Sequence, residues 1–590
     1  MHMRKRIAII DRQKCHPQEC GNYLCAKLCP VNRAGADCIY PGDDDKKKAR
    51  IDEMLCTGCG ICPKRCPFGA ITIINLPETL NKAPVHRYGE NMFELYSLPT
   101  PLFGQVVGIV GKNGIGKSTA LKIMSNLLKP NLGKWDNPAD FKEVIQYFKG
   151  TETQKFMEKL HKNEISLSYK PQQVDLIPKQ FSGTVRQLLQ QVDSKNQLST
   201  IAATLELTHF LDTAIASISG GELQRTAIAA SVLKGANLYL FDEPTSYLDI
   251  KQRVKVSHFI RTLATPETAT LVIEHDLIIL DYMTDLLNIM YGHEGAYGIV
   301  SGIKSSREGI NAFLEGYLKE ENIRFRDHQI KFEKIQDYTQ GIPRLLLSWS
   351  NLSVQLGNFS LQTHSGKLYR NEIIGILGEN GIGKTTFMKM LAGLIKPQQG
   401  ELSEIVRVSY KPQYLETSAE MLVGEFLQQA TQKHHNQLIV PLDLEKLFTQ
   451  KLSELSGGEL QRVAIAHCLS QDADLFLLDE PSAYLDIEQR LVISKVIKNL
   501  AFGRDITILV IDHDLMFLDY LSDRLMVFTG TPAQNGLLQG PFPLQEGMNL
   551  FLQSLGITLR RDMGSHRPRI NKLDSVKDRE QRADGKWYYS

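Results

Sequence analysis

The sequence contains no long hydrophobic run. Nowhere in its 590 residues does an apolar stretch approach the roughly 18 to 20 residues that a membrane-spanning helix needs. Residues 1–6 read Met-His-Met-Arg-Lys-Arg and lack the apolar region of a secretory signal. Neither sign of charge dominates, because 68 Lys and Arg stand against 66 Asp and Glu, a net charge of +2. We therefore expect a cytoplasmic protein with no membrane partner.

Cysteine is almost absent from the later part of the chain. Nine of the ten cysteines lie at or before Cys66, and the tenth is Cys468, which we expect in the core. Cysteines crowded at metal-ligand spacing, in a chain without a secretory signal, favour metal binding in a reducing compartment over disulfides.

The second run of cysteines has the spacing of a bacterial-type ferredoxin, Cys56-x2-Cys59-x2-Cys62-x3-Cys66-Pro67. In that pattern three thiolates bind one [4Fe–4S] cluster and the fourth binds a neighbouring cluster. An earlier set of cysteines supplies the remaining ligands. We predict two clusters, one bound by Cys56, Cys59, Cys62 and Cys29, and the other by Cys66, Cys15, Cys20 and Cys25.

Other readings of this segment stay open. Zinc sites with four cysteines use the same residue type but do not need the crossed Cys-Pro run. Cys38 is left over, and we expect it to be unligated. The sequence has no flavin, haem or nicotinamide motif that would supply an electron partner, so a structural role for the clusters is at least as well supported as a redox role.

The rest of the chain repeats itself at an offset of 267 residues, the distance from Lys117 to Lys384. The pattern G-x4-G-K-[ST] occurs at residues 111–118 and again at 378–385, each time between an apolar strand and a helical run. In this context the backbone N–H groups and the helix dipole bind phosphates. The predicted nucleotide contacts are Gly111, Asn113, Gly114, Gly116, Lys117, Ser118 and Thr119 in the first copy, and Gly378, Asn380, Gly381, Gly383, Lys384, Thr385 and Thr386 in the second.

Each copy also carries the residue types that bind magnesium and polarise water. The expected magnesium ligands are Ser118, Gln172 and Asp242 in the first copy, and Thr385, Gln413 and Asp479 in the second. Glu243 and Glu480 are expected to orient the attacking water. His275 and His513 each follow a strand, 33 or 34 residues beyond the acidic pair, and we expect them to sense the γ-phosphate.

The repeated Ser-Gly-Gly-Glu-Leu-Gln segments resemble the signature of ABC-type ATPases. The resemblance implies that the signature of one cassette caps nucleotide held by the other. Ser219, Gly220 and Gly221 would complete the Lys384 site. Ser456, Gly457 and Gly458 would complete the Lys117 site. Tyr247-Leu-Asp249 and Tyr484-Leu-Asp486 resemble the loops that couple the two sites. For adenine stacking the candidates are Tyr88, Phe93 and Phe359, although aromatic residues before a cassette are as often core.

The expected fold class is α/β, with two ABC-type nucleotide-binding domains head-to-tail, an N-terminal ferredoxin-like α+β iron–sulfur domain and a bipartite hinge. The first copy has about 26 extra residues, because Lys117 lies 55 residues before Gln172 whereas Lys384 lies 29 before Gln413. The predicted boundaries are 1–76 for the iron–sulfur domain, 77–293 for the first cassette with a helix–loop–helix insertion at about 134–165, 294–341 for one hinge, 342–535 for the second cassette, and 536–590 for the other hinge and a basic tail.

Together these features look like the class E ABC ATPases, the RNase L inhibitor family. The resemblance covers essentially the whole chain. It implies a monomer that splits ribosomes after termination or rescue, works with a release factor or Pelota-type factor, and remains on the rRNA and protein of the small subunit. Residues 1–75 hold 13 Lys and Arg against 8 Asp and Glu, and residues 556–590 hold 9 against 5. A basic excess at both ends suits docking on a polyanion.

Two other classes of protein fit parts of the sequence. A tandem import ATPase would need a permease, and such ATPases lack a ferredoxin-like head. An iron–sulfur redox or cluster-assembly ATPase would use nucleotide to drive electron or cluster transfer. Nucleotide-dependent co-sedimentation with ribosomal subunits discriminates among the three.

Overall fold

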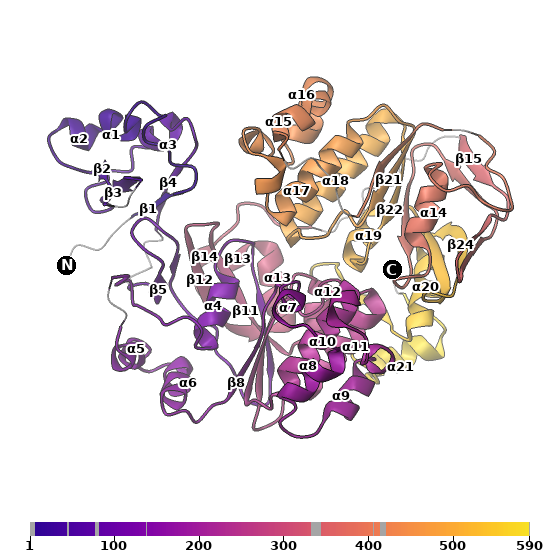
Figure 1. The fold of residues 1–590 in the computed structure, drawn as a ribbon, viewed down its shortest axis with the longest axis horizontal. Coiled ribbons are helices and arrows are strands. Elements are labelled where there is room, and N and C mark those ends of the chain that lie inside the picture. Colours follow the sequence, from indigo (N-terminus) through magenta and orange to yellow (C-terminus); the bar gives the residue numbers. More distant parts are fainter. Residues whose placement is uncertain are drawn as a thin grey trace. The chain divides into compact units, whose positions relative to one another are not determined.

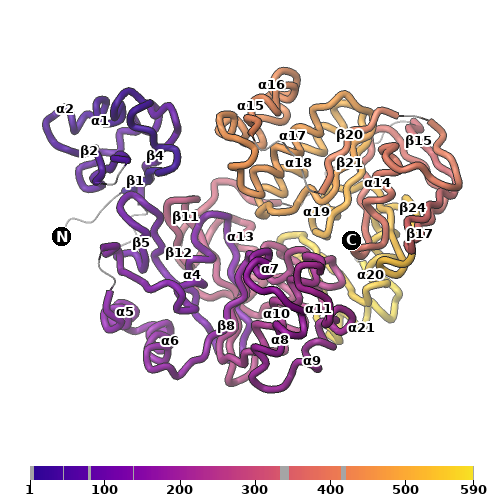
Figure 2. The backbone as a smooth tube through the Cα atoms, viewed as in Figure 1, coloured from indigo at the N-terminus to yellow at the C-terminus, as the bar shows by residue number. Residues whose placement is uncertain are grey.

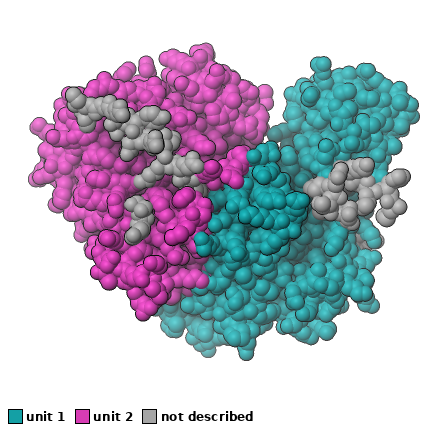
Figure 3. Space-filling model, turned by 180° about the vertical axis from the view of Figure 1, so that it is seen from behind, with its two compact units in different colours: residues 1–244, 259–274, 284–327 teal, residues 245–258, 275–283, 328–590 magenta. Residues whose placement is uncertain are grey.

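The computed structural model describes residues 6–43, 46–76, 82–136, 139–331, 344–404, 406–413 and 420–588. Two compact units divide the chain (Figure 3). One comprises residues 1–244, 259–274 and 284–327, and the other comprises 245–258, 275–283 and 328–590. The boundaries expected at 76/77 and 341/342 involve residues outside the described ranges.

The N-terminal segment is small and contains two antiparallel strand pairs, β1 (Arg6–Ile10) with β4 (Ile71–Asn75) and β2 (Ile39–Pro41) with β3 (Ala49–Ile51). Ile7 lies opposite Ile74 in the first of these pairs. Its core holds Ala8, Ile39 and Ile51 together with cysteines. Cysteine side chains thus fill positions that larger apolar residues occupy in an ordinary core. The elements are β1 (Arg6–Ile10), α1 (Leu24–Leu28), α2 (Pro30–Arg33), β2 (Ile39–Pro41), β3 (Ala49–Ile51), α3 (Ile61–Arg65) and β4 (Ile71–Asn75).

An eight-stranded sheet forms the frame of the first cassette. Strands β7 (Val106–Val110), β9 (Leu238–Asp242) and β10 (Ala269–Ile273) are parallel and buried along their length, as expected for strands covered by helices on both faces. The strands lie in the order β5 (His86–Arg87), β6 (Glu94–Leu95), β12 (Tyr297–Ser305), β11 (Leu286–His293), β7 (Val106–Val110), β10 (Ala269–Ile273), β9 (Leu238–Asp242) and β8 (Leu167–Lys170). Apart from α5 and α6, described below, the helices of this part of the chain are α4 (Lys117–Met124), α7 (Ile177–Gln180), α8 (Val185–Val192), α9 (Leu198–Thr204), α10 (Gly220–Leu233), α11 (Ile250–Thr262), α12 (Leu277–Met283) and α13 (Ser306–Glu315). The pair β13 (Tyr317–Leu318) and β14 (Ile323–Arg324) follows them.

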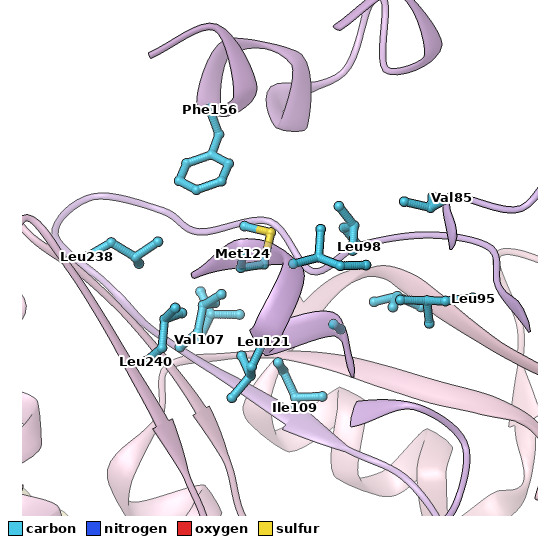
Figure 4. Close-up of a cluster of buried hydrophobic side chains, with 14 of the residues drawn as sticks. Val85, Leu95, Leu98, Val107, Ile109, Leu121, Met124, Phe156, Leu238 and Leu240 are labelled. Carbon is cyan, nitrogen blue, oxygen red and sulfur yellow. The ribbon is translucent and has the colours of Figure 1, made fainter. Parts of the chain in front are cut away.

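Two helices lie within the segment 134–165, α5 (Phe141–Tyr147) and α6 (Glu152–His161). Their apolar side chains join the core of the first cassette. Phe156 of α6 points toward Met124 of α4 in Figure 4, and Val144 of α5 belongs to the same buried cluster. The extra segment therefore extends the cassette core.

The second cassette has the same strand order as the first, position by position. Figures 1 and 2 trace the chain through both cassettes. Its strands lie in the order β16 (Ser353–Leu356), β17 (Phe359–Thr363), β24 (Asn535–Pro543), β23 (Arg524–Thr531), β19 (Ile373–Leu377), β22 (Thr507–Ile511), β21 (Leu475–Asp479) and β20 (Val408–Lys411). A separate pair is formed by β15 (Leu345–Trp349) and β18 (Gly366–Tyr369). The helices are α14 (Lys384–Leu391), α15 (Val423–Phe426), α16 (Gln428–His434), α17 (Gly457–Leu469), α18 (Ile487–Arg504), α19 (Leu515–Leu521) and α20 (Leu544–Leu555).

Helices cover both faces of the second sheet. Figure 1 shows α17 and α18 on one side of β21 and β22, and α14 on the other. Leu475 and Leu477 of β21 share a buried cluster with Phe387 of α14. Because side chains alternate along a strand, the residues between them face the opposite layer.

Both sheets extend beyond the cassette limits expected at 293 and 535, because β12 and β24 lie within them. After the second sheet, the chain ends in β25 (Leu559–Arg561), β26 (Pro568–Ile570) and α21 (Val576–Ala583). No helix in the described ranges is long and apolar enough to span a bilayer.

Candidate functional site

Each phosphate loop ends at a position that only glycine can occupy. Helices α4 and α14 begin directly after Gly116 and Gly383, whose φ angles are 89° and 97°. A Cβ atom on Gly116 would lie 2.6 Å from Cζ of Phe93, and one on Gly383 would lie 2.9 Å from Cζ of Phe359. Positive φ and lack of space both exclude a side chain here. The backbone can therefore turn tightly into the helix N-terminus.

The three aromatic candidates for adenine stacking border these loops. Phe93 and Phe359 lie against Gly116 and Gly383, and each packs on the core of its own cassette. Tyr88 is 43% exposed, and its hydroxyl lies 3.1 Å from Oγ1 of Thr119. Of the three, Tyr88 presents the most accessible ring.

The loop lysines point into the loops. Nζ of Lys117 donates to the carbonyl oxygens of Gly111 and Lys112 at 2.9 and 2.6 Å. Nζ of Lys384 donates to the corresponding carbonyls of Gly378 and Glu379 at 2.8 and 2.7 Å. Each ammonium group is thus held where backbone N–H groups would surround phosphate oxygens.

A hydroxyl and a carboxylate meet beside each lysine. Oγ1 of Thr385 donates to Oδ2 of Asp479 at 2.9 Å, and Ser118 makes the corresponding bond to Asp242. Burial raises the pKa of both carboxyl groups. Within the described ranges, no group of three or more His, Cys, Asp and Glu side chains is placed to hold a metal ion by itself. Two hard oxygen donors are suited to Mg²⁺, because this ion takes its other ligands from water and phosphate.

The two glutamates expected to polarise water are held in strained backbone conformations. The φ angles of Glu243 and Glu480 are 46° and 48°. Nε2 of Gln172 donates to Oε1 of Glu243 at 2.7 Å, and Gln413 bonds Glu480 in the same way. Burial, followed by the nearby carboxylate of Asp479, raises the pKa of Glu480. A raised pKa makes the carboxylate a better proton acceptor.

Two side chains that the sequence reasoning missed fix the backbone of each glutamate. Nζ of Lys170 donates to the carbonyl oxygens of Asp242 and Glu243 at 3.0 and 3.1 Å, and Nε2 of Gln224 donates to that of Glu243 at 2.7 Å. In the second copy, Lys411 donates to Asp479 at 2.8 Å and Gln461 to Glu480 at 2.6 Å. Burial lowers the pKa of Lys170 and Lys411 to about 8. The repeated Tyr-Lys-Pro-Gln and Glu-Leu-Gln segments contained this signal.

The histidines lie in buried positions. Nε2 of His513 lies 3.6 Å from Oε1 of Glu480. Burial lowers the pKa of His513 well below its usual value, so the ring is neutral and this contact is not an ion pair. His275 is 7% exposed and lies between β10 and α12.

The side chain of each signature serine caps the N-terminus of a long helix. Ser219 is the N-cap of α10, and Ser456 is the N-cap of α17. Both form capping boxes, because Glu222 and Glu459 accept from the serine backbone N–H groups at 2.8 and 2.9 Å. The serines and the first glycine of each signature are exposed. Each exposed helix N-terminus can approach a phosphate.

The loop after the first acidic pair contacts the second phosphate loop. The backbone N–H of Asn380 donates to Oδ2 of Asp249 at 3.0 Å. Nζ of Lys251 lies 2.8 Å from Oε1 of Glu379. Part of the first cassette therefore lies against the nucleotide loop of the second.

The N-terminal cysteines gather in one small core. Burial raises the pKa of Cys25 to about 11, and the thiols that raise it further are those of Cys20, Cys15 and Cys66. Burial raises the pKa of Cys62 to about 12, and the largest thiol contributions come from Cys56 and Cys59. Most of these thiol interactions fall within the two expected ligand sets, and Cys25 of one set also raises the pKa of Cys62 in the other. Thiolates from neighbouring segments are the ligands that [4Fe–4S] clusters take.

Cys38 and Cys468 belong to neither expected ligand set, and of the two only Cys38 lies in the same core cluster as the expected ligands. Cys38 is 1% exposed, and its sulfur lies 3.8 Å from the carbonyl oxygen of Asp52. Its largest thiol contact is with Cys29. Cys468 is buried in α17, and Oγ of Ser409 lies 3.2 Å from its sulfur.

Three sequence families match four parts of the chain. Residues 103–246 and 361–483 match the ABC transporter family. Residues 6–37 match a family described as a possible Fer4-like domain in RNase L inhibitor, and residues 49–72 match the 4Fe–4S binding domain. The N-terminal segment is thus an iron–sulfur domain of the 4Fe–4S type, and the cassettes are ATP-binding domains.

Relatives match over nearly the full length. An uncharacterised ABC transporter ATP-binding protein of Methanocaldococcus jannaschii is 49% identical over 99% of this chain and 97% of its own. The translation initiation factor RLI1 of Saccharomyces cerevisiae is 42% identical over 99% of this chain and 98% of its own. The solved structure of ribosome-bound archaeal Pelota and ABCE1 matches with 49% identity and a TM-score of 0.93 over 100% of both chains. Archaeal ABCE1, a ribosome recycling factor solved with the stalk protein aP1, matches with 48% identity and a TM-score of 0.81 over 86% of this chain and 99% of its own.

Proposed function

Because the chain belongs to the RNase L inhibitor family of twin-cassette ABC ATPases, also called ABCE1, we propose that it recycles ribosomes. The protein is an ABC-type ATPase. In the proposed cycle, ATP-driven closure of the cassettes splits the ribosome into subunits after termination or rescue. The protein then remains on the small subunit, in contact with rRNA and protein, in the cytoplasm.

The observation that carries this proposal is the match over the whole chain, head included. The similarity to ribosome-bound ABCE1 covers 100% of both chains with a TM-score of 0.93. Import ATPases lack such an iron–sulfur head. We propose a release factor or Pelota-type factor as the partner on the ribosome, and the ribosomal stalk as a further contact, since relatives are described with Pelota and with aP1.

We assign each ATP site to both cassettes. Site one would combine Lys117, Gln172, Asp242, Glu243 and His275 with Ser456 and Gly458. Site two would combine Lys384, Gln413, Asp479, Glu480 and His513 with Ser219 and Gly221. The contact between Asp249 and the N–H of Asn380 at 3.0 Å supports this pairing, because it places a loop of the first cassette on the phosphate loop of the second.

In each site, residues of this chain bind the phosphates of ATP and orient and activate the attacking water. Backbone N–H groups and the loop lysine bind the phosphates. Glu243 and Glu480 accept a proton from the attacking water, which Gln172 and Gln413 help to position. Neutral His513 presents a hydrogen bond to the γ-phosphate end of site two. A Mg²⁺ ion bound by Ser118 and Asp242, or by Thr385 and Asp479, would neutralise phosphate charge.

We also propose two [4Fe–4S] clusters with the ligands expected from the spacing. Cys25 lies with Cys20, Cys15 and Cys66, which supports one set. Cys62 lies with Cys56 and Cys59, which supports the other. Cys29 would complete the second set. Without iron and sulfide this segment has little apolar surface to bury, so the clusters hold it together.

Sedimentation of the purified protein with separated ribosomal subunits tests the function. We expect it to pellet with the small subunit when a non-hydrolysable ATP analogue is present, and to dissociate with ADP. Splitting of intact ribosomes should need ATP and a Pelota-type factor. Binding to neither subunit in any nucleotide state would contradict the proposal and favour a redox or cluster-assembly ATPase.

A further inference from the structure

An arginine at the same place in each cassette joins two functional loops. Nε of Arg253 donates to the carbonyl oxygen of Leu248 at 2.9 Å, and Nη1 donates to Oδ2 of Asp276 at 3.0 Å. In the second cassette, Nε of Arg490 donates to the carbonyl of Leu485 at 3.0 Å, and its Nη1 pairs with Asp514. One planar guanidinium group therefore spans both loops.

Each end of the first bridge touches an element of a nucleotide site. Leu248 directly precedes Asp249, which accepts the backbone N–H of Asn380 in the second phosphate loop. Asp276 directly follows His275, the expected sensor of site one. Oδ1 of Asp276 also accepts from the N–H groups of Ile278 and Ile279 at 3.0 and 3.2 Å, so it anchors the start of α12.

The bridge also reaches the second histidine loop. Nη1 of Arg253 lies 3.4 Å from the carbonyl oxygen of His513. The side chains of Arg253 and Asp276 are 16% and 5% exposed, and those of Arg490 and Asp514 are 14% and 2% exposed. Poorly solvated charge pairs of this kind are costly to break by removing one partner, because the other charge is left buried.

We propose that Arg253 is a positioning residue that couples the phosphate loop of site two to the histidine sensor of site one. The route runs from Asn380 through Asp249 and Leu248 to Arg253, and then through Asp276 to His275. A shift of the phosphate loop when nucleotide binds would move the arginine and the carboxylate next to the sensor. The inference rests on the composite sites proposed above. Arg253 touches neither nucleotide nor water in this scheme.

The test measures how occupancy of site two changes turnover at site one. In a Glu480→Gln background site two holds ATP but hydrolyses it slowly, and in a Lys384→Ala background it binds ATP weakly. The ratio of kcat in these two backgrounds reports the coupling. We expect a ratio different from one in the native chain. We expect Arg253→Met to bring it at least about fivefold closer to one, the lower end of typical coupling factors.

Further variants separate a bridge from a general loss of structure. Asp276→Asn keeps the Oδ1 acceptor for α12 but removes the charge that faces Arg253. It should move the ratio toward one as Arg253→Met does, and the double variant should lose no more coupling than either single one. The KM for ATP at site one should change little. Arg261→Met is the matched control, since this arginine lies on the same helix and pairs with Asp285 at 3.1 Å.

The proposal is overturned if the native ratio equals one, if Arg253→Met leaves it unchanged, or if the two losses add as independent effects. An equal loss in Arg261→Met would also overturn it. All these measurements use the full protein without ribosomes. A failure to split ribosomes would therefore contradict ribosome recycling and leave the bridge untouched. A failure of the coupling assay would contradict the bridge and leave ribosome recycling untouched.

Discussion

Lys170 and Lys411 place a buried ammonium group behind the backbone of each acidic pair, 3.0 and 2.8 Å from the carbonyl oxygens of Asp242 and Asp479. We expect Lys411→Met to lower kcat by about tenfold or more, because losing a hydrogen bond from a charged donor costs about 1.5 to 3 kcal/mol. The KM for ATP should hardly change, since the lysine lies behind the carboxylate. Steady-state ATPase kinetics give both values.

Lys304→Met is the matched control for that variant. Lys304 is 8% exposed and pairs with Glu320, and both residues lie in the segment 294–341 expected to form a hinge. Its replacement should leave kcat unchanged. A raised KM with a normal kcat in Lys411→Met would mean that the lysine binds nucleotide rather than positioning Glu480.

The same lysine predicts a pH dependence of stability in nucleotide-free protein. Burial lowers the pKa of Lys411 to about 8, whereas an unfolded lysine titrates near about 10.4. Between these values the unfolded chain binds more protons than the folded chain, so the folded state gains stability as the pH rises. We therefore expect the unfolding temperature of the native protein, relative to that of Lys411→Met, to rise between pH 7 and pH 9.5. A difference that is constant or opposite in sign would contradict the buried charge.

Cysteine variants test the cluster ligands. Cys62→Ser should lose about half of the bound iron and sulfide, because one of two cubanes loses a ligand. Cys38→Ser is the control, since Cys38 is equally buried but lies outside both proposed sets, and it should keep full iron content. Iron and sulfide analysis of anaerobically purified protein measures both. Stoichiometric zinc without sulfide would replace the clusters by zinc sites.

Sequence motifs can propose residues whose type is dictated by chemistry, such as Lys117 and Asp242, and their roles at the nucleotide stay predictions. They could not assign Lys170 or Gln224, although both stand inside quoted repeats. These two act through backbone carbonyls 72 and 19 residues away along the chain, and any residue offers a carbonyl. Such contacts depend on which strands become neighbours, which only the folded sheet reveals.

At the level of elements, the repeat predicted two like cassettes, and the two sheets have the same strand order. The sequence boundaries left out β12 and β24. These strands contain Gly298 and Gly302, and Gly540 with Pro541, residues that are unfavourable inside strands and typical of loops. Antiparallel pairing with β11 and β23 overrides that local preference.

The helix that each signature begins allows a test of head-to-tail pairing. Ser219→Arg should lower turnover at the Lys384 site more than at the Lys117 site, because a long side chain would occupy the nucleotide's place against α10. The variant also loses an N-cap, which costs about 0.5 to 2 kcal/mol. Site-specific turnover is read in Glu243→Gln and Glu480→Gln backgrounds.

Ser305→Arg controls for the lost cap. Ser305 caps α13 by accepting from the N–H of Glu308 at 3.3 Å, and it belongs to no proposed site. It should affect stability in a similar way and leave turnover normal. Greater damage to the Lys117 site in Ser219→Arg would show that each signature serves its own cassette.

For the whole molecule, the sequence predicted an iron–sulfur domain, the head, directly before the first cassette. The structure adds contacts that tie them. Arg87, next to Tyr88, pairs with Glu53 of the head at 2.9 Å, and Asn91 accepts the N–H groups of Ile10 and Ile51. No spacing pattern predicts such contacts, because they join segments far apart in the sequence. They tie the head to the segment on both sides of Tyr88, a candidate for adenine stacking.

The last prediction concerns how hydrolysis becomes mechanical work. Glu243→Gln with Glu480→Gln should slow hydrolysis by several kcal/mol of barrier while leaving ATP binding nearly unchanged, because the phosphate loops and signatures stay intact. The closed state should then accumulate as a nucleotide-stabilised complex with the small subunit. We expect this double variant to split ribosomes once, in a single-turnover assay, and to fail in repeated cycles. Closure alone would then supply the force, and hydrolysis would serve release. A double variant that binds ATP and ribosomes but cannot split even once would make hydrolysis itself the step that does the work.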